Sequence, residues 1–141
     1  MIGCYPIQSD EGNDFRSIRD IIRLLKGGRC ITVFPEGTRS ETGQLKEAEG
    51  GIGFLAMKSG AYVVPLYIEG SYEAFPKGAK KIKPHKINVY FGDAFIPAED
   101  ERFKGLTEPY GAVADAIMAE IANLKMKADG LPVAGTTDRP R

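Results

Sequence analysis

The sequence lacks the features that mark several common classes of protein. Its 141 residues carry 19 basic and 19 acidic side chains, and so have no net charge. This balance argues against nucleic acid as the main partner, because domains that grip phosphate backbones are usually strongly basic. No apolar run approaches the ~18 residues that a membrane-spanning helix needs, and Met1 is not followed by the basic and apolar stretches of a signal peptide. We therefore expect a cytoplasmic protein that does not cross a membrane.

Cysteine and histidine are also scarce, which leaves little material for a metal centre. The two cysteines, Cys4 and Cys30, stand in no metal-binding spacing. Cys30 opens an apolar run, where a buried free thiol is the simplest expectation. The single histidine, His85, lies in a lysine-rich stretch, and we expect it to be solvated.

The distribution of apolar residues predicts alternating strands and helices. Helical spacing from Phe15 to Leu25 predicts an amphipathic helix, with Asn13 as its cap. A short helix is expected at 52–59, and a last helix is expected to be capped by Thr107. Strands are expected at 2–7, 29–34, 62–68 and 87–91, the second of them buried and parallel because it lacks polar alternation. Pro65, inside the third strand, predicts an edge or a bulge there.

This alternation indicates an α/β fold with a mostly parallel sheet, flanking helices and right-handed crossovers. A hydrophobic fraction of 43% is enough for one core. Residues beyond about 128 are rich in Gly, Pro, Thr and Arg, and they are expected to form a loose tail.

The loop from Phe34 to Ser40 carries the clearest chemistry. It follows a predicted parallel strand, where open α/β sheets place ligands. Gly37 allows the backbone to approach a ligand closely. Arg39 offers a fork of donors that matches phosphate oxygens, and Thr38 and Ser40 can add neutral donors. The alternative is a polar strand-end turn in which Glu36 and Arg39 pair with each other.

Three segments resemble signature blocks of the 1-acyl-glycerol-3-phosphate acyltransferase family. Residues 34–40 (FPEGTRS) are identical to the third block, residues 63–68 (VVPLYI) resemble the fourth, and residues 3–7 (GCYPI) resemble the second. The order and spacing also agree, and the resemblance extends from about Gly3 to Phe95. It implies a glycerol-3-phosphate acyltransferase-like fold and a site for the acceptor's glycerol phosphate at Glu36, Gly37, Thr38 and Arg39.

The resemblance also implies that Val64 and Pro65 support the fatty-acyl site, although both fit equally well as plain sheet core. The implied reaction moves a fatty-acyl group from acyl-CoA or acyl carrier protein to lysophosphatidate or a similar acceptor. It needs a base and charge stabilisation, and no metal or redox cofactor is implied. The implied location is the inner face of the membrane, as a peripheral protein.

The family's first block, His-x-x-x-x-Asp, which supplies the general base, has no counterpart in this sequence. Five residues after His85 stands Tyr90, and His85 follows the glycine loop instead of preceding it. We therefore expect an N-terminally truncated sequence, with residues 1–127 as the C-terminal portion of the domain and 128–141 as a flexible tail. Without a positioned base, which typically contributes about 10²–10⁴ in rate, we expect this chain alone to be inactive.

Two departures from the family's pattern remove positive charge from the implied phosphate pocket. The second block usually ends in a basic residue near Ser9, and the family often has a lysine after the third block, where Glu49 stands here. They leave a second function open: a non-catalytic phosphoglycerolipid-binding module. A third, unrelated to lipids, is an α/β domain that binds a soluble phosphometabolite.

A basic stretch from Pro76 to Lys86 contains no acidic residue. Near an anionic bilayer each such charge can contribute about 1 kcal/mol to binding, so a membrane-surface contact is one interpretation and a solvated loop is the other. Its lysines are Lys77, Lys80, Lys81, Lys83 and Lys86.

Overall fold

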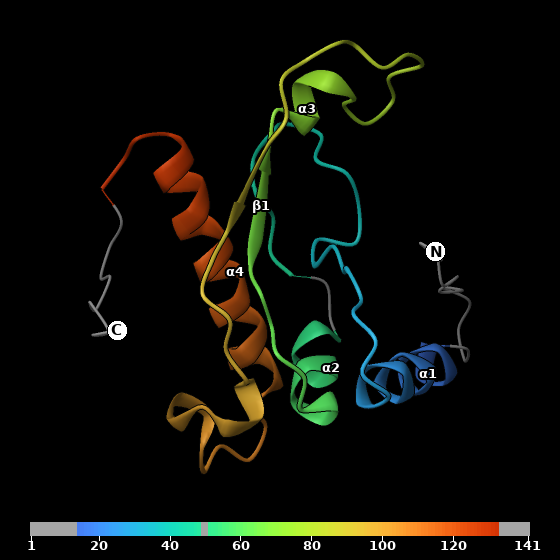
Figure 1. The fold of residues 1–141 in the computed structure, drawn as a ribbon, viewed down its shortest axis with the longest axis vertical. Coiled ribbons are helices and arrows are strands. Elements are labelled where there is room, and N and C mark those ends of the chain that lie inside the picture. The colour runs from blue at the N-terminus through green and yellow to red at the C-terminus, as the bar shows by residue number, and fades with distance from the viewer. Residues whose placement is uncertain (1–13, 49–50, 133–141) are drawn as a thin grey trace.

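A long helix and a two-stranded ribbon organise the described part of the chain, which in this computed structural model comprises residues 14–48 and 51–132 (Figure 1). The helix is α4 (Tyr110–Ala128), and the ribbon joins β1 (Leu66–Glu69) to β2 (Asn88–Phe91). The two strands are antiparallel, with Leu66 opposite Phe91 and Glu69 opposite Asn88. One face of the ribbon packs on α4, where Tyr67 joins the core.

Shorter helices surround this pair. α1 (Asp14–Lys26) packs against α2 (Ile52–Ser59), and α2 packs against α4. α3 (Ser71–Ala74) lies beyond the end of β1, at the top of the view in Figure 1. Two 3₁₀ turns, η1 (Pro97–Glu99) and η2 (Glu101–Phe103), precede α4. None of the helices in residues 14–48 and 51–132 is long and apolar enough to cross a bilayer.

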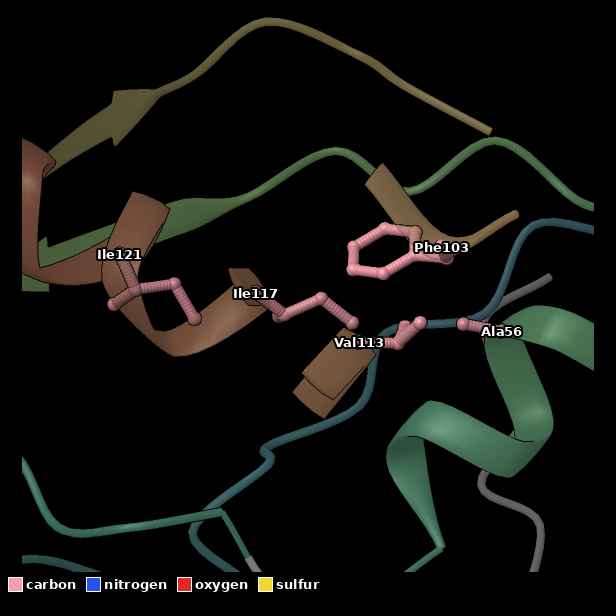
Figure 2. Packing of buried hydrophobic residues seen from close by; sticks show 5 residues of the cluster. All are labelled: Ala56, Phe103, Val113, Ile117 and Ile121. Carbon is pink, nitrogen blue, oxygen red and sulfur yellow. The ribbon is translucent and has the colours of Figure 1, made fainter. Parts of the chain in front are cut away.

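The core lies where α2 and η2 meet α4. Figure 2 shows the side chains of Ala56, Phe103, Val113, Ile117 and Ile121 along this junction, and Val113 is completely buried. The α4 residues recur every four positions, because one helix face then points at a single neighbour. This stripe fixes α4 against α2 at one end and against the ribbon at the other.

The crossing of α2 and α4 depends on a glycine. A Cβ atom added to Gly53 would lie 1.9 Å from the carbonyl oxygen of Tyr110, so any side chain would push the two backbones apart. Beside this contact the rings of Phe54 and Tyr110 meet edge to face, with centroids 5.1 Å apart.

The helix predictions are confirmed within the described residues, whereas part of the strand prediction is wrong. α1 and α2 occupy the expected segments, and β2 falls within the expected strand at 87–91. Residues 29–34 form no strand, and Cys30 and Phe34 are exposed, the latter by 65%. No described segment pairs with 29–34, and without a ladder partner the apolar run is not covered.

The expected mostly parallel sheet is likewise not what the described residues show, since their one sheet is the antiparallel ribbon.

The first residues of one strand and one helix also differ from the predictions. β1 begins only at Leu66, because Pro65 has no N–H to donate, although its carbonyl accepts from the Gly92 N–H at 2.9 Å. α4 begins at Tyr110 with Pro109 as its N-cap, so Thr107 does not cap it.

Several predictions lie outside the described residues. These are the strand at 2–7 with Cys4, the second signature block with Ser9, the Asn13 cap, Glu49, and the tail beyond 132.

Candidate functional site

The Phe34–Ser40 segment contains a tight turn. The Gly37 N–H donates to the Phe34 carbonyl at 3.1 Å, which closes a four-residue turn with Pro35 at its second position. Gly37 has a φ of 65°, in the left-handed region that favours glycine. The turn is therefore encoded locally, by proline and glycine at the positions that need them.

Glu36 and Arg39, the two charged residues of the turn, do not form an ion pair within the described part of the chain. The Glu36 carboxylate instead accepts a hydrogen bond from the Lys46 backbone N–H at 3.0 Å. The Arg39 guanidinium carbon lies 4.8 Å from the centroid of the Phe75 ring, and Arg39 is exposed. The alternative in which the two charges neutralise each other is therefore not the observed arrangement.

The hydroxyl of Ser40 serves the loop itself. It donates to the Gln44 carbonyl at 3.1 Å and accepts from the N–H groups of Thr42 and Gly43 at 3.3 and 2.8 Å. The hydrogen of Ser40 is thus used internally, so this residue does not provide the free donor that the sequence suggested. The Thr38 hydroxyl lies 3.5 Å from the Arg39 carbonyl, a weak contact that leaves it accessible.

Two residues of the α3 region attach it to this loop. The Tyr72 hydroxyl donates to the Glu41 carbonyl at 3.0 Å, and the Lys77 ammonium lies 2.5 Å from the Glu41 carboxylate. The hydrogen bond and charge of Lys77, together with the charge of Lys46, lower the pKa of Glu41 below its ordinary value of 4.5. Lys46 and Lys77 therefore add positive charge near the loop that carries the exposed guanidinium of Arg39.

These contacts define a surface suited to an anion rather than an enclosed cavity. A cavity of about 300 Å³ lies elsewhere, between the N-terminal ends of α2 and α4, and is lined by residues that include Glu47, Phe54, Tyr110 and Asp115. Neither Glu36 nor Arg39 lines it. The arginine nonetheless keeps its N–H groups available, since no group in residues 14–48 and 51–132 accepts a hydrogen bond from its side chain.

The two residues expected to support an acyl chain differ in exposure. Val64 is 47% exposed, whereas Pro65 is buried beneath the ribbon. Their neighbour Val63 forms an isolated bridge with Phe95 and packs on the core. Val64 therefore presents an apolar surface, while Pro65 acts as part of the framework.

The lysine-rich segment projects beyond the ribbon as a loop with a closed base. A Cβ atom added to Gly70 would lie 2.1 Å from the Lys86 carbonyl oxygen, and the Lys83 N–H donates to the Ala74 carbonyl at 2.8 Å. Ile82 is 74% exposed in the middle of this loop, and His85 is also exposed. All five lysines are exposed, and Lys77 pairs with Glu41: Lys77, Lys80, Lys81, Lys83 and Lys86.

Sequence reasoning did not find Tyr72, Phe75 or Lys46 as neighbours of the loop. Tyr72 and Lys77 lie 31 and 36 residues from Glu41 in the chain, so no local spacing signals the contact. A cluster of aromatic and basic residues after β1 is the one hint that the sequence offers.

Comparison with known proteins finds similarity to acyltransferases in both sequence and structure. The model of the acyltransferase family matches residues 1–69. A chloroplastic 1-acyl-sn-glycerol-3-phosphate acyltransferase of Arabidopsis thaliana is 34% identical over 86 residues, a match that covers 60% of this chain and 24% of that protein. The enzyme of that name from Pseudomonas aeruginosa is 29% identical over 130 residues, which are 86% of this chain and 49% of the relative.

A solved structure agrees with the sequence matches. The 1-acyl-sn-glycerophosphate (LPA) acyltransferase PlsC of Thermotoga maritima superposes with a TM-score of 0.63 at 31% identity, covering 79% of this chain and 47% of that one. These matches confirm the resemblance to the 1-acyl-sn-glycerol-3-phosphate acyltransferase family that the signature blocks indicated. The chain spans less than half the length of each of the relatives described here.

Proposed function

We propose that the chain takes part in transferring a fatty-acyl group from acyl-CoA or acyl carrier protein to lysophosphatidate or a similar glycerolipid acceptor. The observation that carries this proposal is the exposed guanidinium of Arg39, which lies beside a glycine turn and whose N–H groups have no acceptor among residues 14–48 and 51–132. The proposed reaction is taken from the names of the relatives. The Arg39 side chain in the loop is suited to the phosphate group of the acceptor in that reaction.

Glu36, Gly37, Thr38 and Arg39 form the proposed acceptor site. Arg39 donates a fork of N–H groups to the phosphate, an arrangement stronger than a hydrogen bond between neutral groups. Thr38 adds a hydroxyl donor, and Gly37 allows the head group to approach the backbone. Glu36 holds the loop in shape through the Lys46 N–H, so its task is to fix the turn rather than to contact the substrate.

The acyl chain is proposed to lie against Val64, whose side chain is apolar and 47% exposed. Pro65 supports this segment from the buried side. Burial of apolar surface contributes about 25 cal/mol per Å², so an exposed valine of this kind gains from contact with a hydrocarbon chain.

Proton transfer needs a general base that these residues do not supply. His85 is exposed on the lysine-rich loop, and Glu36, the one carboxylate of the Phe34–Ser40 segment, already accepts a hydrogen bond from the Lys46 N–H. The chain's proposed share of the reaction is therefore to bind and orient the acceptor. A non-catalytic phosphoglycerolipid-binding module is the second candidate, and the same observation favours it: an acceptor site without a base.

The lysine-rich loop is proposed to touch the surface of an anionic membrane, at its inner face. Lys80, Lys81, Lys83 and Lys86 form no ion pair within the described residues, and Ile82 presents an apolar side chain among them. Positive charge around an exposed apolar residue suits the boundary between head groups and acyl chains.

The acceptor site is tested by substitution of Arg39 with alanine. We expect the binding of lysophosphatidate to weaken about tenfold or more, because charge-assisted hydrogen bonds contribute roughly 1.5–3 kcal/mol, while monoacylglycerol binding stays unchanged. Arg29, an exposed arginine in the segment just before the loop, is the matched control, and Arg29→Ala should bind as the wild type does. Equal loss for both lipids would contradict a phosphate contact.

The membrane contact is tested by sedimentation with vesicles. A variant with serine at positions 80, 81, 83 and 86 should lose binding to vesicles that contain phosphatidylserine and keep the weak binding of the wild type to neutral vesicles. Serine at Lys26 and Lys127, two exposed lysines outside the loop, is the control for loss of positive charge elsewhere on the chain. Unchanged sedimentation of the loop variant would rule out this surface.

A further inference from the structure

We propose that Phe75 is a positioning residue for Arg39: its ring holds one face of the guanidinium so that the N–H groups at the edge point toward the acceptor phosphate. This inference rests on the proposed function, because it assigns Phe75 a task at the same site. It adds a residue from outside the signature blocks to the acceptor site.

The geometry of a guanidinium makes the two contacts compatible. The group is planar, and its five N–H donors lie in the plane, while its faces attract the electron-rich face of an aromatic ring. The guanidinium carbon of Arg39 lies over the Phe75 ring, 4.8 Å from the ring centroid. The donors stay free within the described part of the chain, so a phosphate can be bound without breaking the ring contact.

The backbone that carries the Phe75 ring is held by groups other than Arg39. The Phe75 N–H donates to the Ser71 carbonyl at 2.9 Å, at the end of α3, and the preceding residue Ala74 is buried. The Ala74 carbonyl in turn accepts from the Lys83 N–H at 2.8 Å. The backbone of Phe75 is therefore fixed independently of Arg39, and it carries the ring to the guanidinium.

The loop that carries Arg39 is held against α3 and the residues that follow it by contacts of its own. Tyr72 donates to the Glu41 carbonyl at 3.0 Å, and its ring packs over Gly43, where an added Cβ would lie 3.2 Å from a ring carbon. Lys77 pairs with the Glu41 carboxylate at 2.5 Å. Because these contacts join the loop to the segment that carries Phe75, the side chain of Arg39 loses little further freedom when it binds a ligand.

Phe75 contributes little to the core, which makes its position informative. The side chain is 36% exposed and lies outside the cluster that contains Phe103 and Val113. An aromatic residue that is partly exposed and stacked on an arginine can be changed without opening a cavity in the core. Its effect on binding can therefore be separated from its effect on folding.

The experiment measures the binding of sn-glycerol 3-phosphate to the full chain by NMR titration, with glycerol as the unphosphorylated control. Phe75→Leu keeps an apolar side chain but removes the aromatic ring, whereas Phe75→Tyr keeps the aromatic ring. We expect Phe75→Leu and Phe75→Ala to bind two- to fivefold more weakly, the range that an exposed cation–π contact supplies, on the order of 0.5–1 kcal/mol. Phe75→Tyr should bind as the wild type does.

The outcomes separate this inference from the function on which it rests. If Phe75→Leu binds as tightly as the wild type, or if Phe75→Tyr is as weak as Phe75→Leu, the aromatic face is not what matters and the inference is wrong. If Arg39→Ala binds like the wild type, or the wild type itself does not bind, the acceptor site is wrong and the inference falls with it. Loss with Arg39→Ala and none with Phe75→Ala overturns the inference alone. Should Phe75→Ala fail to fold, the comparison of Leu with Tyr decides.

Discussion

The crossing of α2 and α4 gives a prediction whose sign can be worked out atom by atom. Alanine at Gly53 would place its Cβ 1.9 Å from the Tyr110 carbonyl oxygen and 2.8 Å from the carbonyl carbon. Contacts between such atoms are ordinarily about 3.5–4.0 Å, so the helices would have to separate by roughly 1.6–2.1 Å. Neither atom belongs to a flexible side chain that could turn aside, and the shift would loosen the contact between Ala56 and Val113.

Forced separation of packed elements typically costs about 1–3 kcal/mol, and a backbone clash belongs at the upper end of that range. The higher helix propensity of alanine returns up to about 1 kcal/mol. We therefore expect Gly53→Ala to lower the free energy of unfolding by about 2 kcal/mol. The matched control is Gly111→Ala in α4, where nothing lies within 4 Å of the added carbon, and the same substitution should stabilise by about 0.5–1 kcal/mol.

Urea unfolding followed by circular dichroism at the helical band measures both variants. With an m-value of about 2 kcal/mol per M, the midpoint of Gly53→Ala should fall by about 1 M, and that of Gly111→Ala should rise. A Gly53→Ala midpoint at or above that of the wild type would refute the close crossing, and with it the arrangement of α2 and α4.

Three further predictions concern the core and two titrating groups. Val113→Ala, at a site that is 0% exposed, should lower the free energy of unfolding by about 2–3 kcal/mol, since it removes two buried methyl groups and leaves a cavity; a change below 1 kcal/mol in urea unfolding would contradict the packing of Figure 2. Lys77→Met should raise the pKa of Glu41 toward its ordinary value of 4.5, as measured by carbon NMR, because the lowered pKa depends first on the Lys77 hydrogen bond. The lowered pKa of Glu41 stabilises the wild type above pH 4.5, and this stabilisation is lost as the pH falls through the lowered pKa. The free energy of unfolding of Lys77→Met should therefore fall less steeply with decreasing pH in this range. Glu69→Gln should lower the pKa of Tyr90, which burial and then the hydrogen bond and charge of Glu69 raise above 10.0, and an ultraviolet titration that shows no change would exclude the Glu69 contact.

Helices were the most predictable part of this fold, because their signal is local. The spacing of Ile18, Ile21 and Leu25 is enough to define α1, and Gly60 ends α2 in the left-handed conformation typical of a C-cap. The start of α4 was less predictable, because Thr107 has the right side chain for a cap while Pro109 holds that position without one.

Strands were less predictable, because a strand depends on a partner that can lie far away in the chain. Residues 29–34 have the composition of a buried strand, yet composition does not say what pairs with them, and Phe34 remains exposed. The direction of pairing is equally nonlocal: β1 and β2 are joined by a long connection that contains α3, which suits a parallel crossover as well as the antiparallel ribbon observed.

The candidate site divides in the same way. The turn at Gly37 and the exposure of Arg39 follow from residues within one short segment, and both could be predicted. The partner of Arg39 could not, because Phe75 lies on a different element and reaches the arginine only through the fold. A pair of Glu36 and Arg39, the alternative that the sequence left open, would have been a local contact. In the structure Glu36 contacts Lys46 and Arg39 contacts Phe75, both outside the segment.

The closed base of the lysine-rich loop has a practical consequence. Gly70 and Lys86 meet backbone to backbone, so the two ends of the loop keep their spacing whatever the tip contains. Around Gly78, by contrast, an added Cβ would meet nothing within 4 Å, and lengthening a loop costs only about 0.6 kcal/mol for each doubling. A peptide tag or a reporter for fluorescence can therefore be grafted at the tip, where it would report the proposed contact with lipid while the ribbon below keeps its register.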